Sequence, residues 1–358
     1  MTDYENKKRK LYLKKREQFY FQWHITNKCN LRCRHCYIDD YAIEPSFATM
    51  VSILGRIVEF LDENNGYCHL CLMGGEPFVS PHLFRILDYI EMEKNIIEFS
   101  LGTNGLLLTQ EIIDKLKTYS KFRAIQISID GTPETHDSIR GKGTFEKALN
   151  SVKLLHENGR DCSVSFTANR LNYKQFPKVA ELAFNAGAGL VWTDRVVPLG
   201  DADKKKDIID NLLLTDEEFL EYIDAIKEAN DKFDKIGIER KLIALHLKSP
   251  QMHGCYPGVR QFSITANGDL LPCRRMDENF GSIIDKKISE VLQEHRDIIC
   301  MINDIPDDCK KCNYVKKCRG GAKCQTCAVY GDYNHPDPNC LFLKSKESDR
   351  DGCNGCAV

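Results

Sequence analysis

The chain has 358 residues, a formal net charge of −2 at pH 7 and 17 cysteines. A charge so close to zero gives no general attraction to nucleic acid or to a membrane surface, and no apolar run approaches the ~20 residues that cross a bilayer. The basic segment 1–17 has no apolar stretch behind it, so it does not resemble a secretory signal. Many cysteines without such a signal favour metal or cluster ligation over disulfides and predict a cytoplasmic protein.

Stretches of strand and helix character alternate between residues 18 and 200. In one expected helix Ile53, Leu54 and Ile57 share a face at helical spacing. Six strand–helix units in series predict a parallel sheet with right-handed crossovers, hence an α/β fold built as an open, partial (β/α)6 TIM-type barrel. Chemistry in such barrels gathers at the C-terminal ends of the strands. The expected strands cover 19–26, 67–73, 96–101, 124–129, 163–167 and 190–193.

Three cysteines follow the first expected strand within eight residues: Cys29, Cys33 and Cys36. Thiols this crowded cannot form unstrained disulfides, and tetrahedral zinc sites prefer paired thiols that recur as a second pair. Three thiolates on one loop suit a cubane iron–sulfur cluster, in which they hold three irons and leave the fourth open to a small molecule.

This spacing resembles the signature of the radical S-adenosylmethionine (SAM) enzymes. The resemblance implies a [4Fe-4S] cluster whose open iron chelates SAM, and whose electron cleaves SAM to a 5′-deoxyadenosyl radical. It also implies a motif for the SAM amino group at the end of the second strand. There, two glycines allow close backbone approach and a glutamate offers an acceptor. The residues that match this motif are Gly74, Gly75, Glu76 and Pro77.

The same resemblance implies further SAM contacts at the ends of the third and fourth strands, with Ser128 and Arg140 at the SAM carboxylate. His35 stands where the family usually has an aromatic residue, and an imidazole can stack in that place. No Asp, Glu or Tyr in the barrel is marked out by spacing as a general base, so the catalytic residues stay unassigned. The implied additional contacts are Tyr37, Thr103, Asn104, Ser128, Asp130 and Arg140.

A second group of cysteines begins after a helical linker at 201–250. There are too many thiols here for one metal ion, and spacing alone leaves a pair of zinc ribbons as an alternative. Residues 261–265 and 269–271 are expected to form a β-hairpin around Asn267 and Gly268. The cysteines between 251 and 345 are Cys255, Cys273, Cys300, Cys309, Cys312, Cys318, Cys324, Cys327 and Cys340.

This order resembles the SPASM domain, which carries two auxiliary iron–sulfur clusters. The resemblance implies that Cys255 and Cys273 belong to the first cluster. Ala322 replaces a usual family cysteine, so Cys324 and Cys327 are the candidates to complete it, as a [2Fe-2S] or [4Fe-4S] centre. The tail 346–358 holds two more cysteines, read as a redox relay, a ligand pair or an incidental terminus. The residues implied for the second cluster are Cys309, Cys312, Cys318 and Cys340.

These resemblances imply an enzyme that modifies a ribosomally made peptide or small protein through a thioether or carbon–carbon link. A ferredoxin or flavodoxin is the expected electron donor. Three alternatives stay open at this point: a formylglycine-generating maturase of sulfatases, a tetrapyrrole side-chain-modifying enzyme, and a non-enzymatic iron–sulfur electron carrier.

Overall fold

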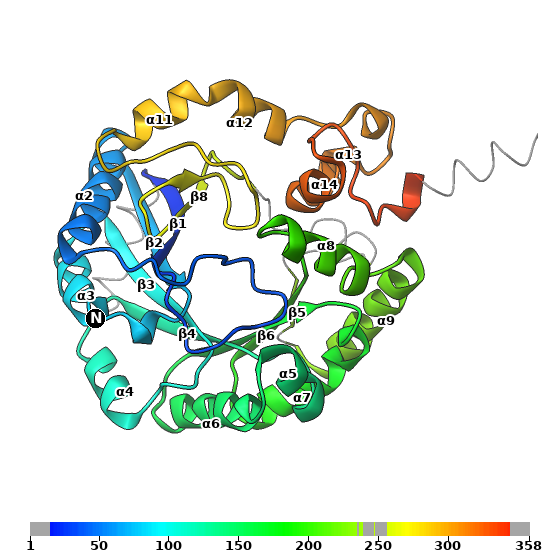
Figure 1. Cartoon of the computed structure of the whole chain (residues 1–358), viewed down its shortest axis with the longest axis horizontal. Coiled ribbons are helices and arrows are strands. Elements are labelled where there is room, and N and C mark those ends of the chain that lie inside the picture. The colour runs from blue at the N-terminus through cyan, green and yellow to red at the C-terminus, as the bar shows by residue number, and fades with distance from the viewer. Residues whose placement is uncertain (1–14, 235, 239–246, 248–255, 344–358) are drawn as a thin grey trace, which may run out of the picture.

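The computed structural model describes residues 15–234, 236–238, 247 and 256–343. The expectations for Cys255, for the two cysteines of the tail and for most of the basic N-terminal segment lie outside these residues. The described chain is built on one nine-stranded sheet with the order β7-β6-β5-β4-β3-β2-β1-β8-β9. Its two ends, β7 and β9, are not paired with each other in this order, so the predicted open barrel is confirmed (Figure 1).

The six predicted parallel strands all form, and each pairs in parallel with the next in sequence. Many of their buried side chains are apolar, and Phe21, Trp23 and Phe99 are fully buried. The strands are β1 (Glu17–Thr26), β2 (Gly66–Gly74), β3 (Ile96–Thr103), β4 (Phe122–Ser128), β5 (Cys162–Ala168) and β6 (Leu190–Arg195).

Helices form the outer layer around these strands (Figure 1). The predicted apolar face of α2 is buried, and the side chain of Ser46 caps its start by accepting from the backbone N–H of Thr49. A short helix that the sequence analysis did not separate, α5, begins at Pro133 and ends at Arg140. The helices are α2 (Phe47–Glu63), α3 (Leu83–Met92), α4 (Gln110–Lys117), α5 (Pro133–Arg140), α6 (Thr144–Glu157) and α7 (Phe176–Asn185).

The segment after β6 also contributes to the sheet. It contains α8 (Ala202–Asn211) and α9 (Asp216–Lys232), and a capping box of Thr215 and Glu218 opens α9. The three-residue strand β7 (Ile236–Ile238) then pairs in parallel with β6. A strand this short carries too few residues for a recognisable alternation, so the sequence did not indicate it.

The predicted hairpin is formed by β8 (Gln261–Ile264) and β9 (Leu270–Leu271). It joins the barrel, because β8 pairs in parallel with β1 from Tyr20 to Trp23. The rings of Phe21 and Phe262 stack across this junction with centroids 5.2 Å apart. The chain that leaves the hairpin is therefore held against the strand that leads into the three-cysteine loop.

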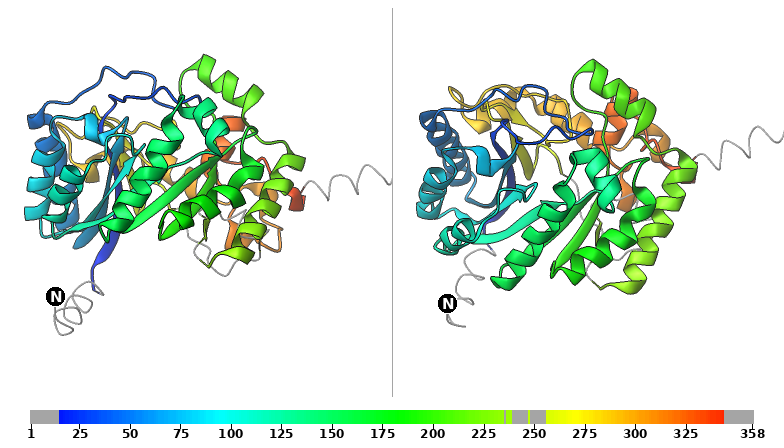
Figure 2. Two further views of the ribbon diagram at one scale, coloured as in Figure 1. Left: turned by 90° about the horizontal axis from the view of Figure 1, so that it is seen from below. Right: turned by 60° about the horizontal axis from the view of Figure 1, so that its bottom comes forward.

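The remaining helices follow the hairpin in the chain, and α11 and α12 lie on the same side of the molecule as β8 (Figure 1). Figure 2 gives two further views, in which the loop between β1 and α2 arches over the strand ends. Among the described residues, no helix is both long and apolar enough to span a bilayer. The C-terminal helices are α11 (Ile288–Glu294), α12 (Arg296–Asn303), α13 (Val315–Cys318) and α14 (Lys323–Tyr330).

Candidate active site

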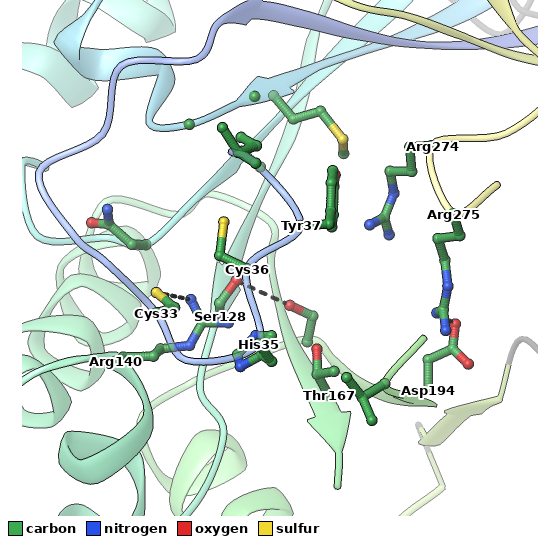
Figure 3. A pocket seen from close by; sticks show the side chains of 18 of the residues that line it. Cys33, His35, Cys36, Tyr37, Ser128, Arg140, Thr167, Asp194, Arg274 and Arg275 are labelled. Atoms are coloured by element: carbon green, nitrogen blue, oxygen red, sulfur yellow. Dashed lines mark hydrogen bonds and ion pairs between the residues drawn. The ribbon is translucent and has the colours of Figure 1, made fainter. Parts of the chain in front are cut away.

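A cavity lies at the C-terminal ends of the strands, and we call it the SAM cavity after the ligand that the sequence resemblance implies. Its walls come from the three-cysteine loop, from the ends of β2 to β6 and from the segment after β9. Figure 3 shows Cys33 and Arg140 on one side of it and Arg274 and Arg275 on the other. The structure gathers ten of the thirteen residues expected at this site: Cys29, Cys33, Cys36, Tyr37, Gly74, Gly75, Thr103, Asn104, Ser128 and Arg140.

The three thiols of the loop are free and half-buried. The side-chain nitrogen of Asn104 lies 4.0 Å from the sulfur of Cys29, and a guanidinium nitrogen of Arg140 lies 3.9 Å from that of Cys33. Burial raises the pKa of the Cys33 thiol to about 11, although Arg140 acts in the opposite direction. Loading with iron must therefore displace a proton from this thiol.

The donor set fits an iron–sulfur cluster. Within the described ranges, no three His, Cys, Asp or Glu side chains form a group that could hold a single metal ion. Three thiols on one loop, spread around a cavity with an amide and a guanidinium beside them, match a larger group with room for a further ligand.

Asp130 lies behind the cavity wall and fixes the groups that do line it. Its fully buried carboxylate accepts from Nε of Arg140 at 2.6 Å and from the backbone N–H of Thr167 at 2.7 Å, and Nε2 of His35 lies 3.5 Å away. Burial alone would raise the pKa of Asp130, but Arg140 and His35 hold it below its usual value. The structure thus places Asp130 as an anchor for Arg140 and the three-cysteine loop, off the cavity surface where direct SAM contact was expected.

Glu76 is also buried away from the cavity surface. Its carboxylate accepts from the hydroxyl of Thr103 at 2.7 Å, from the backbone N–H of Asn104 at 2.8 Å and from that of Phe78 at 3.2 Å. Burial raises the pKa of Glu76 to about 7. Its oxygens hold the turn after β3, whereas the sequence analysis assigned them to a ligand ammonium; Pro77 begins the 3-10 helix η1 (Pro77–Val79) behind it.

The glycines of this motif are required by a close approach between two backbone segments. A Cβ at Gly74, whose φ is 135°, would lie 2.1 Å from the carbonyl oxygen of Thr26, and one at Gly75 would lie 2.2 Å from that of Lys28. The backbone N–H groups of Gly75 and Glu76 donate to these same carbonyls, at 2.8 Å each. The motif therefore clamps the start of the three-cysteine loop while its glycines line the SAM cavity.

Sequence reasoning missed the part of the wall that follows β9. Arg274 lies next to Tyr37 (Figure 3), whose hydroxyl is 3.3 Å from Nε2 of His24. Burial, with a contribution from the charge of Arg274, lowers the pKa of His24 to about 4. Arg275 forms a buried ion pair with Asp194 at the end of β6. Position next to Cys273 was the one signal in the sequence that could have pointed to these arginines.

A second set of thiols gathers far along the chain, in what we call the C-terminal cysteine site. Its cavity is lined by all four cysteines expected to hold the second auxiliary cluster, with Asp337 beside them. Burial, and then the neighbouring thiols, raise the pKa of Cys309 to about 12. Four thiols around one cavity fit a second cluster. These cysteines are Cys309, Cys312, Cys318 and Cys340.

The other expected ligands come from the segment after β9 and from α14. Cys273 is buried and its sulfur accepts from Nε2 of Gln261 at 3.7 Å. Cys324 and Cys327 lie one turn apart on α14, with Cys324 buried beside Arg275. The remaining expected ligand of this group, Cys255, lies outside the described residues, so the structure leaves the composition of the first auxiliary site as a prediction.

Comparison with known proteins identifies the class. The model of the radical SAM superfamily matches residues 23–183, and that of the SPASM iron–sulfur cluster-binding domain matches residues 255–313. The chain belongs to the radical SAM superfamily, carries a SPASM-type domain and is an enzyme that uses SAM and iron–sulfur clusters.

Its relatives differ in their named activities. The chain is 27% identical over 351 residues to an AdoMet-dependent heme synthase of Methanosarcina barkeri, a match that covers 91% of this chain and 97% of the relative. It is 26% identical over 335 residues to the mycofactocin maturase MftC of Mycolicibacterium smegmatis, covering 89% and 81%. A solved structure of anSMEcpe with bound AdoMet and Cp18Cys peptide has the same fold, with a TM-score of 0.73 at 20% identity over 91% of this chain and 95% of that one.

Proposed function

We propose that this enzyme abstracts a hydrogen atom from a ribosomally made peptide and so forms a thioether or carbon–carbon crosslink. One geometric observation carries the proposal: a second pocket adjoins the SAM cavity, and the two share Tyr37, Ile38, Leu199 and Arg274 in their walls. This second pocket is lined by residues at the end of β1 and from the β8–β9 hairpin, and such space beside the reactive site suits a chain-like substrate.

Several relatives support the peptide assignment. They include the subtilosin biosynthesis protein AlbA of Bacillus subtilis, which is 30% identical over 266 residues, 72% of this chain and 55% of AlbA. The sporulation killing factor maturation protein SkfB of the same organism is 27% identical over 274 residues. Together with MftC, they are maturation or biosynthesis proteins, and the proposal assigns this chain to their kind of chemistry.

The proposal gives the residues of the SAM cavity the following roles. Cys29, Cys33 and Cys36 would hold a [4Fe-4S] cluster, which, reduced by a ferredoxin or flavodoxin, supplies the electron that splits SAM into methionine and the 5′-deoxyadenosyl radical. Arg140 and Asn104 orient the thiols. Ser128 and Arg140 bind the SAM carboxylate, and the backbone at Gly74 and Gly75 receives the amino group. Apolar side chains exclude water from the far wall: Trp192, Val196, Val197 and Leu199.

Anaerobic reconstitution tests the proposal. The protein is incubated with SAM, a low-potential reductant and candidate cysteine-rich precursor peptides. We expect 5′-deoxyadenosine together with a peptide lighter by two hydrogens per link. The matched control is Cys33→Ala, which should produce neither. Release of 5′-deoxyadenosine with an unchanged peptide would contradict the peptide assignment while leaving SAM cleavage intact.

A tetrapyrrole side chain is the second candidate substrate. Arg274 lies in the walls of both cavities and favours a carboxylate-bearing molecule, and the match to the heme synthase covers nearly the whole of both chains. Incubation with Fe-coproporphyrin III in place of peptide tests this candidate. A new tetrapyrrole by absorption and mass spectrometry would support it, and an unchanged spectrum would exclude it.

A further inference from the structure

Two consecutive residues at the end of β6 each pair with an opposite charge from the C-terminal part of the chain. Asp194 pairs with Arg275, which follows the hairpin, and Arg195 pairs with Asp337, which precedes Cys340. All four side chains are buried. The end of β6 is thus a place where buried ion pairs join the barrel to the cysteine-rich part of the chain.

The Arg195–Asp337 pair has the fork geometry of a strong ion pair. The two terminal nitrogens of Arg195 donate to the two carboxylate oxygens of Asp337 at 2.9 and 2.8 Å. The side-chain oxygen of Asn339 accepts from the same guanidinium at 2.5 Å. Arg195 lines the SAM cavity, whereas Asp337 lines the C-terminal cysteine site. One ion pair therefore reaches from one site to the other.

Asp337 also fixes the loops that carry two of the thiols. Its backbone N–H donates to the carbonyl of Gly320 at 2.9 Å, and its carboxylate accepts from the backbone N–H of Ala322 at 3.0 Å. The backbone N–H of Cys340 donates to the carbonyl of Asp337 at 2.8 Å. The residue thus ties the turn after Cys318 to the start of the Cys340 segment.

A purely structural role explains this pair poorly. Buried ion pairs lose much of their attraction to desolvation, and well-packed apolar residues of similar volume are often at least as stabilising. Fixed charges beside an iron–sulfur cluster, in contrast, act directly on its reduction potential. Asp337 lines the same cavity as Cys318 and the other three thiols, so its carboxylate lies beside the proposed ligands.

We propose that Arg195 and Asp337 are positioning residues that set the reduction potential of the cluster held at the C-terminal cysteine site and couple that cluster to the wall of the SAM cavity. The proposal rests on a cluster at this site and on no particular substrate. An experiment in which the peptide stayed unmodified would therefore not contradict this proposal.

The test is an EPR-monitored redox titration of the anaerobically reconstituted full-length protein. The signal of the C-terminal cluster is assigned by its loss in Cys312→Ala. Asp337→Asn removes a negative charge yet keeps an oxygen for Ala322, so we expect a more positive midpoint potential. Arg195→Gln should shift the potential in the opposite direction, and Arg195→Lys should restore it towards the wild-type value.

The matched control is Arg170→Gln, which breaks a 3.1 Å ion pair with Glu218 outside both cavities and should leave the potential unchanged. Opposite shifts, with full iron content, support the proposal. If only Asp337→Asn loses iron, the proposal is decided by the sign of the potential shift in Arg195→Gln and by the return of the potential towards wild type in Arg195→Lys. Shifts of the same sign, no shift, or loss of this cluster's iron from both variants would overturn it.

Discussion

The thiols of the three-cysteine loop are half-exposed around the SAM cavity, whereas three of the four thiols at the C-terminal cysteine site are buried. The first set lies on one loop between β1 and α2, and the second is drawn from segments more than twenty residues apart. The fold thus presents one set of ligands to an incoming molecule and encloses the other. This difference suits one cluster that binds a substrate-sized ligand and another that only exchanges electrons.

The largest expected effect is the loss of SAM cleavage when the exposed set is broken. Cys33→Ala removes one of three ligands on a loop with no spare thiol, so release of 5′-deoxyadenosine should fall to background. Iron content should fall by about four atoms per chain, and the C-terminal cluster should remain. The measurements are an iron assay and chromatography of the nucleoside products. Loss of all iron would show that the two regions do not load independently.

Cys312→Ala should give the converse result. We expect loss of the C-terminal cluster and of substrate product, with SAM cleavage in the absence of substrate kept within about threefold of wild type, because Cys312 does not line the SAM cavity. Chromatography of parallel reactions with and without substrate measures the two rates. A variant in which SAM cleavage also stops would contradict the separation of roles.

Asp130→Asn tests the anchor of the exposed set. The charge that holds Arg140 and His35 is lost, while the size of the side chain is retained, so the rate of SAM cleavage should fall by about 10- to 100-fold through misplacement. Stopped-time assays at saturating SAM measure this rate. Asp114→Asn, a substitution at an exposed carboxylate on α4, is the control and should change nothing. An unchanged rate of SAM cleavage in Asp130→Asn would contradict the role of Asp130 as an anchor.

The smallest expected effect concerns Glu76 and pH in the protein without clusters. Its folded-state pKa is raised to about 7, above the ordinary value of 4.5. The folded state therefore keeps a proton that the unfolded chain releases, and Glu76 should make the free energy of unfolding decrease as pH rises from about 4.5 to 7. In Glu76→Gln this part of the pH dependence should disappear, as chemical denaturation at several pH values would show. If the free energy of unfolding changed with pH by the same amount in the wild type and in Glu76→Gln, this prediction would be refuted.

Much of the architecture followed from local patterns. The six strands were predictable because each is a short apolar run with turn residues behind it, and the four thiols of the C-terminal cysteine site because their spacing resembles a known domain. Pairing between β1 and β8 was not predictable, since more than 230 residues separate Trp23 from Ile264 and no local pattern marks the contact.

The candidate site shows the same contrast between features that local sequence predicts and features that depend on distant packing. Sequence located Glu76 and Asp130 near the cavity but could not tell that both carboxylates are buried behind its surface, because burial depends on how distant segments pack. The arginines at 274 and 275 were missed for a related reason: they reach the cavity through the hairpin, and the ion pair of Arg275 joins it to Asp194, 81 positions away in the chain.

The parallel pairing of β8 with β1 has a consequence for anyone who wishes to dissect this enzyme. A fragment that ended after β6 would leave the backbone N–H and C=O groups of β1 from Tyr20 to Trp23 without their partner strand, next to the ring of Phe21, and such an edge recruits strands from other molecules. The cysteine-rich extension thus supplies a strand of the barrel sheet itself, and a fragment without it should aggregate and should not act as a minimal catalyst.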